Sequence, residues 1–125
     1  MTIEPVHRIY KIPMSDWISM MANELEIDAV GLWQIIPCGR EDFSLDESDL
    51  VDFVQRCIIS LLERGAKPVL GGGKKGDYPW IVQYHYGETN EEIAENIINE
   101  WSGWSFADPS LGGIWFATPK IYEST

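Results

Sequence analysis

Two stretches of the chain combine the hydrophobic spacing of an amphipathic helix with polar residues suited to begin one. In the first, the apolar stripe consists of Leu50, Val54, Cys57, Ile58, Leu61 and Leu62. Ser44 and Glu47 precede the stripe with the spacing of a capping box, and Gly65 and Pro68 follow it as stop signals. The pattern predicts a helix over residues 45–64.

The second stretch repeats this arrangement later in the chain. Thr89 and Glu92 have the capping-box spacing, and Gly103 is placed to end the helix. The apolar side of this second helix consists of Ile93, Ala94, Ile97, Ile98 and Trp101. Both helices are therefore expected to pack one face against a core and to expose the other.

The first third of the chain has weaker signals. An N-terminal helix is expected to begin at Ser15, whose hydroxyl can cap it, and to end near Glu26. Residues 27–36 suit either a short buried helix or a strand interrupted by Gly31, and we favour the helix. Pro37 is expected to end the segment in either case, because proline lacks the backbone N–H of a helix interior.

Strand signals lie in the second half of the chain. Polar and apolar residues alternate over residues 78–86, and residues 67–70 form a short apolar run, so a hairpin around the glycine-rich stretch 71–76 is expected. The apolar run 114–117 is interpreted as an inner strand. These elements predict one α+β domain, residues 1–125, with three to four helices packed on one face of a small, mainly antiparallel β-sheet.

The excess of acidic residues bears on the function of the protein. The 125 residues include 20 Asp and Glu against 9 Lys and Arg, a formal net charge of −11. Such a field repels nucleic acid and anionic lipid and speeds encounters with cationic partners. No run approaches the roughly 20 apolar residues of a membrane span, and the first residues lack the features of a signal peptide. We therefore expect a cytoplasmic protein with free cysteines, no membrane association and no nucleic-acid partner.

The acids gather where the two capped helices begin. Six lie within residues 41–52 and seven within residues 76–119, and neither stretch contains Lys or Arg. The helix dipole accounts for part of this pattern. If both helix starts lie on the same side of the domain, they form one anionic surface for a basic protein, with Trp104 as an aromatic anchor. The expected contacts are Glu41, Asp42, Asp46, Glu47, Asp49, Asp52, Glu91, Glu92, Glu95 and Trp104.

No motif for a metal or a nucleotide is present in the sequence. The stretch 71–76 contains Gly and Lys, but it lacks the following Ser or Thr and the helix of a phosphate-binding loop. Asp46, Asp49 and Asp52 share a predicted helix face, yet no calcium-binding loop surrounds them. The sequence thus predicts neither a metal nor a cofactor.

Enzymatic chemistry has one weak candidate. Cys38 is expected in a loop beside Arg40, where the cation would lower the thiol pKa, and His85 is the histidine considered as its base. The other histidine, His7, lies far from His85 in the sequence. We expect the protein to act by binding, and keep a small enzyme using Cys38 and His85 as the less favoured alternative.

The order of elements carries a resemblance. An acidic helix ends in Leu61-Leu62-Glu63-Arg64-Gly65-Ala66-Lys67-Pro68-Val69, and a glycine loop, an aromatic strand, a second acidic helix and Gly112-Gly113-Ile114-Trp115-Phe116 follow. Over most of residues 44–118 the chain resembles small acidic bacterial immunity proteins of contact-dependent growth-inhibition and polymorphic toxin systems.

This resemblance implies a protein that blocks a cognate toxin, often a basic nuclease, by covering its active site or a surface that it needs. The alternative is a housekeeping or regulatory module that binds a protein other than a toxin. The identity of the partner and the oligomeric state stay open at this point.

Overall fold

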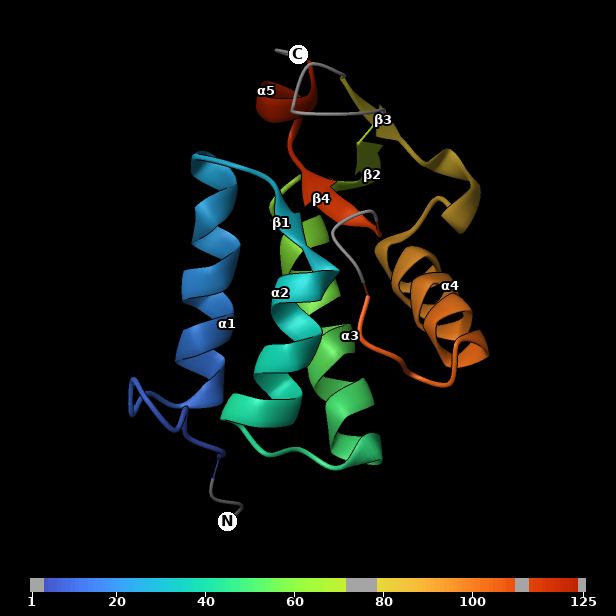
Figure 1. The fold of residues 1–125 in the computed structure, drawn as a ribbon. Helices are drawn as coiled ribbons and strands as arrows, with labels where there is room; N and C mark the ends of the chain where they lie inside the picture. Colours follow the sequence, from blue (N-terminus) through green and yellow to red (C-terminus); the bar gives the residue numbers. More distant parts are fainter. Residues whose placement is uncertain (1–3, 72–78, 110–112, 124–125) are drawn as a thin grey trace.

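The computed structural model describes residues 4–71, 79–109 and 113–123 (Figure 1). The α-helices are α1 (Met14–Asn23), α2 (Leu32–Pro37), α3 (Glu47–Glu63), α4 (Asn90–Gly103) and α5 (Pro119–Tyr122). The strands are β1 (Val30–Gly31), β2 (Lys67–Gly71), β3 (Trp80–Val82) and β4 (Trp115–Ala117). Two 3₁₀ turns, η1 (Glu24–Glu26) and η3 (Tyr84–Tyr86), and a π-helical turn, η2 (Cys38–Asp42), complete the description. The predicted α+β class is confirmed.

The four strands form one antiparallel sheet in the order β1-β4-β2-β3. Strand β4 is internal, as its continuous apolar sequence predicts, because it pairs with β1 through Val30 and Phe116 and with β2 through Val69 and Trp115. Strands β2 and β3 pair as the expected hairpin, with Val69 opposite Val82. The glycine-rich loop that joins them lies largely outside the described residues.

Helix α3 is the centre of the main core. Helices α1, α2 and α4 all pack against it (Figure 1). Phe116 of β4 joins this core, whereas its neighbour Ala117 points to the opposite face of the sheet, because successive strand residues alternate. There Val69 and Ala117 form a second, smaller cluster with Ile121 and Tyr122 of α5. The predicted helices thus cover one face, and the unpredicted helix α5 covers part of the other.

The start of α1 differs from the prediction. Pro13 occupies the N-cap position and Ser15 lies inside the helix, so Ser15 does not cap it. The carboxylate of Glu4 instead accepts hydrogen bonds from the backbone N–H and the hydroxyl of Ser15. An acceptor from the preceding segment thus replaces the local cap. The predicted end is nearly correct, because η1 extends the helical path to Glu26.

Residues 27–36 contain both elements that the sequence left open. Strand β1 comes first, and α2 follows directly. Helix α2 ends at Pro37, as expected, but the chain keeps a helical path because the π-helical turn η2 follows directly. Pro37 has φ −62° and ψ −34°, which are helical values, so its ring removes one backbone hydrogen bond without turning the chain.

The two long helices begin in different ways. Asp46 caps α3 by accepting a hydrogen bond from the backbone N–H of Asp49 (3.0 Å), so the predicted capping box of Ser44 and Glu47 is wrong. Gly65, at φ +91°, occupies the left-handed position expected beyond its end.

The predicted N-cap of α4 at Thr89 is confirmed, and Glu92 pairs with the Thr89 side chain instead of completing the box through the Thr89 backbone N–H. The hydroxyl of Thr89 accepts from the backbone N–H of Glu92 and donates to the Glu92 carboxylate. The strand predicted over residues 78–86 is shorter than expected, because η3 follows β3 and buries Tyr86 against α4.

Candidate functional site

The starts of α3 and α4 lie at opposite ends of the helix pair, because the two helices run antiparallel (Figure 1). A groove joins Glu47 at the start of α3 to Ser105 and Ala107, which follow the end of α4. A second groove joins Lys67, which follows α3, to Glu88, which precedes α4. The expectation that both acidic helix starts form one surface is therefore wrong.

The segment 105–107, which comes directly after Trp104, lies beside the acidic cluster at the start of α3. Trp104 directly follows α4 and is 53% exposed, as the sequence predicts for an anchor. We call this region the acidic end; it comprises Glu41, Asp46, Glu47, Asp49, Asp52 and Trp104. Its five acids are exposed, and none of them forms an ion pair with a residue that the structure describes. The acidic end is thus an anionic surface without ion pairs to the described residues, and Trp104 follows α4 at the same end of the helix pair.

Arg40 holds the segment after α4 against this end of the molecule. Its guanidinium donates to the carboxylate of Asp108 at 2.7 Å and to the backbone carbonyl of Phe106 at 2.6 Å. Arg40 belongs to η2, which precedes α3, so these bonds tie together segments that lie far apart in the sequence. They fix the backbone beside Trp104 and neutralise Asp108.

Asp42 is the one predicted contact of the first acidic cluster that is not available. Its carboxylate accepts from Nε of Arg8 at 2.8 Å and lies 3.4 Å from Nε2 of His7. The hydrogen bond from Arg8 is the main reason why the pKa of Asp42 is lowered. The lack of bases within residues 41–52 did not indicate this neutralisation, because the cation, Arg8, comes from the N-terminal segment.

Glu91, Glu92 and Glu95 form a separate anionic region at the start of α4. Glu91 and Glu92 lie in the first turn, and Glu92 is also engaged by Thr89. Further along α4, Glu100 accepts a hydrogen bond from the hydroxyl of Tyr86 at 2.9 Å. The pKa of Tyr86 is raised, first by its burial and then by this bond. Two acids of α4 are therefore already hydrogen-bonded within the protein, Glu92 by the N-cap residue Thr89 and Glu100 by Tyr86 of η3.

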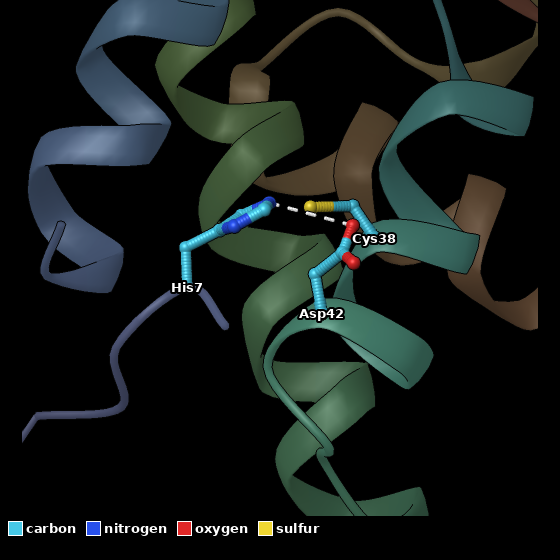
Figure 2. Close-up of side chains that lie close together, drawn as sticks. All are labelled: His7, Cys38 and Asp42. Atoms are coloured by element: carbon cyan, nitrogen blue, oxygen red, sulfur yellow. Dashed lines mark ion pairs between the residues drawn. The ribbon is translucent and has the colours of Figure 1, made fainter. Parts of the chain in front are cut away.

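A cluster that sequence reasoning missed lies between the N-terminal segment and η2 (Figure 2). His7, Cys38 and Asp42 point toward one another, with one donor atom of each within 4.8 Å of the other two. His7 is 2% exposed and Cys38 is 8% exposed. No local signal could have found this cluster, because His7 reaches its partners only after the chain has folded back onto η2.

The hydrogen bonds of His7 determine what this cluster can do. Nδ1 of the imidazole accepts from the backbone N–H groups of Ile9 (3.1 Å) and Tyr10 (3.2 Å). The neutral ring therefore carries its proton on Nε2, where it faces Asp42. A metal ion at Nε2 would need a lone pair there and would move the proton to Nδ1, against two amide donors. These hydrogen bonds thus suit His7 to join the N-terminal segment to η2 better than to bind a metal ion.

The thiol of Cys38 is likewise unsuited to nucleophilic chemistry. Its pKa is raised to about 12, first by burial and then by the charge of Asp42. The expectation of a lowered pKa beside Arg40 is therefore wrong. The imidazole beside Cys38 belongs to His7, whereas His85 is exposed and packs its ring on Tyr86 at 4.1 Å between centroids. The proposed pairing of Cys38 with His85 has no support in this geometry.

Two further findings concern membrane-spanning helices and similarity to known proteins. Within the described ranges, no helix has both the length and the apolar character needed to cross a membrane. The chain matches no protein-family model, no curated protein and no solved structure.

Proposed function

We propose that this chain is an immunity-type binding protein that neutralises a basic protein partner, the cognate toxin domain, through its acidic end. The observation that carries this proposal is the group of exposed acids at the start of α3. They form no ion pair with the described residues and lie at the end of the helix pair where α4 gives way to Trp104. An anionic surface attracts a cationic partner over distance, and a buried aromatic side chain slows its release. Together they supply the two properties that an inhibitor of a basic enzyme needs.

The acidic end is a better candidate than the start of α4 for a physical reason. The acidic end has five exposed acids of the proposed contact set, whereas the start of α4 has three, and Lys67 lines the groove beside them. At the acidic end, Arg40 holds the backbone after Trp104 in place, so less conformational freedom is lost on binding. A groove lined by Asp49 and Asp52 continues this surface toward Arg56 and the N-terminal segment.

The immunity role extends this binding proposal through the resemblance of residues 44–118. A nuclease active site is shaped to accept phosphates, and a row of carboxylates offers it a similar charge. The regulatory module remains the alternative, and the identity of the partner separates the two. A partner that loses toxic activity when bound supports the immunity role.

The test begins with co-purification from the native strain and identification of the bound protein. Association and dissociation rates are then measured for that protein with two matched variants. Asp49→Lys with Asp52→Lys reverses two charges at the acidic end, and Glu91→Lys with Glu95→Lys makes the same net change at the start of α4. The first pair is expected to slow association about tenfold, and the second only about twofold.

Trp104→Ala is expected to change the dissociation rate of the complex. Truncating a central aromatic anchor costs about 1–3 kcal/mol, which raises the dissociation rate by about fivefold to a hundredfold and leaves association nearly unchanged. Equal effects of the two charge-reversal pairs, or an association rate that salt does not change, would show that the acidic end is not the contact.

A further inference from the structure

A groove of about 300 Å³ lies between α1 and the β1–α2 segment and shares no residue with the acidic end. Its buried floor includes Met21 and Val30. Tyr10, Trp17 and Met20 also line it, and Tyr10 and Met20 are 67% and 57% exposed. The groove therefore presents aromatic and thioether surface to solvent on a helix whose other side packs into the core.

Trp17 makes the groove rigid. Its indole packs on Phe43 at 6.0 Å and on Phe53 at 5.6 Å between ring centroids, so its orientation is set by the core. Residues held in place before binding lose little conformational entropy when a ligand arrives. The groove thus has one preformed wall.

Two hydrogen-bond donors of the groove are unused. Neither the indole N–H of Trp17 nor the hydroxyl of Tyr10 is bonded to any residue in ranges 4–71, 79–109 and 113–123. The indole nitrogen is also not among the buried unpaired atoms of these ranges, so solvent can reach it. An occupant that pairs with both donors brings hydrogen-bond acceptors, and backbone carbonyls that are not used within the occupant itself can serve as such.

The charge at the rim of the groove favours an occupant of opposite charge. Glu24 lines it, is exposed, and forms no ion pair with the described part of the chain. Gln34 lines it as well and accepts the backbone N–H of Gly31 through its Oε1 at 2.9 Å. With a net charge of −11 on the whole chain, the rim favours a cation over an anion.

We propose that this groove binds an extended, proline-containing segment of another protein that carries a Lys or Arg beside the prolines. A polyproline II segment has no internal hydrogen bonds, so its carbonyls can accept from Trp17 and Tyr10. The carbonyls of an α-helical ligand are already used and would leave both donors unpaired. Proline rings pack on aromatic walls, and the cation pairs with Glu24.

The inference is tested by NMR with ¹⁵N-labelled protein and a capped peptide of consecutive prolines followed by arginine. The indole N–H resonance of Trp17 is expected to shift progressively as the peptide is raised to about 1 mM, a range that detects even weak binding. The charge-reversal pair Asp49→Lys with Asp52→Lys is expected to leave this titration unchanged, which separates the groove from the acidic end.

Variants of the groove give the second readout. Tyr10→Ala is expected to weaken peptide binding about fivefold to tenfold, and Glu24→Gln about twofold to fivefold. Tyr84→Ala and Glu95→Gln serve as matched controls, because both residues are exposed and lie outside the groove. Both controls are expected to bind the peptide as the unmodified protein does.

Changes in the peptide complete the test. Replacing the prolines by glycine and serine, or the arginine by glutamate, is expected to abolish the shift at Trp17. The proposal is overturned if the Trp17 indole resonance does not move. It is also overturned if the glycine–serine peptide binds equally well, or if a basic amphipathic helical peptide binds this groove more tightly than the proline peptide does.

Discussion

Helices α3 and α4 have nearly the same local design but different positions in the molecule. Both begin with an N-cap side chain, carry acids in the first turn and end near a glycine. Yet seven residues of α3 are buried against three of α4, because α3 has neighbouring helices on several sides. Local signals of equal strength can therefore belong to a central element and to a peripheral one.

The acids at the two helix starts differ in the same way. At the start of α3 they lie beside the segment that follows Trp104, which Arg40 holds in place, whereas at the start of α4 they lie near Lys67 and the exposed Tyr84. Acids near a helix N-terminus are favourable for the helix wherever it lies. What distinguishes a binding surface is thus the neighbours that the fold supplies, and two pairs of variants and one single variant can break or sharpen this comparison.

The largest difference is expected from the core. Phe53 of α3 is fully buried among the rings of Trp17 and Phe43, and Phe53→Ala is expected to lower the free energy of unfolding by about 4 kcal/mol. Ile97→Ala in α4, which removes a smaller side chain, is expected to cost about 3 kcal/mol. Urea unfolding followed by circular dichroism measures both. A greater loss for Ile97→Ala would mean that α4, not α3, is the centre of the core.

The caps come next. Asp46→Ala and Thr89→Ala each remove an acceptor for a backbone N–H and are expected to cost about 1 kcal/mol. Ser44→Ala is the control, because Ser44 does not cap α3, and its effect is expected to stay within about 0.5 kcal/mol. If Ser44→Ala is as damaging as Asp46→Ala, the capping box inferred from the sequence is the correct one after all.

The smallest effect is expected from the ion pair beside the acidic end, and it depends on pH. Since Arg8 holds the pKa of Asp42 below its ordinary value of 3.8, the folded state binds fewer protons than the unfolded state in that range. The stabilisation from Asp42 is therefore fully present above pH 3.8 and is lost as the pH falls through the lower folded pKa.

Asp42→Asn removes the titrating group and sharpens this test. The variant is expected to be less stable than the unmodified protein at neutral pH and to approach it in stability under acidic conditions. Thermal unfolding at a series of pH values measures the difference. A gap between the two proteins that stays constant down to the acid limit would contradict the assigned role of the pair with Arg8.

Much of the fold follows from patterns within single segments. The stripe that begins at Leu50 predicts α3, the box of Thr89 and Glu92 predicts the start of α4, and the run 114–117 predicts an inner strand. These predictions are correct because capping and amphipathic spacing act between residues that are close in the sequence. The exposure of Trp104 follows for the same reason, since it lies just past a helix end.

The features that decide the candidate site arise between distant segments. The sequence contains the acids of both helix starts, but only the antiparallel packing of α3 on α4 separates them and brings Trp104 to one of the two. In the same way, His7 meets Cys38 and Asp42 only in the folded chain, where burial raises the thiol pKa that an exposed loop would have lowered. The sequence by itself determined the long helices α3 and α4, the central strand and the excess of negative charge. Tertiary structure decided which carboxylates stay without a cation, because folding brings together in space charged residues that are far apart in the sequence, as it does for Arg8 and Asp42.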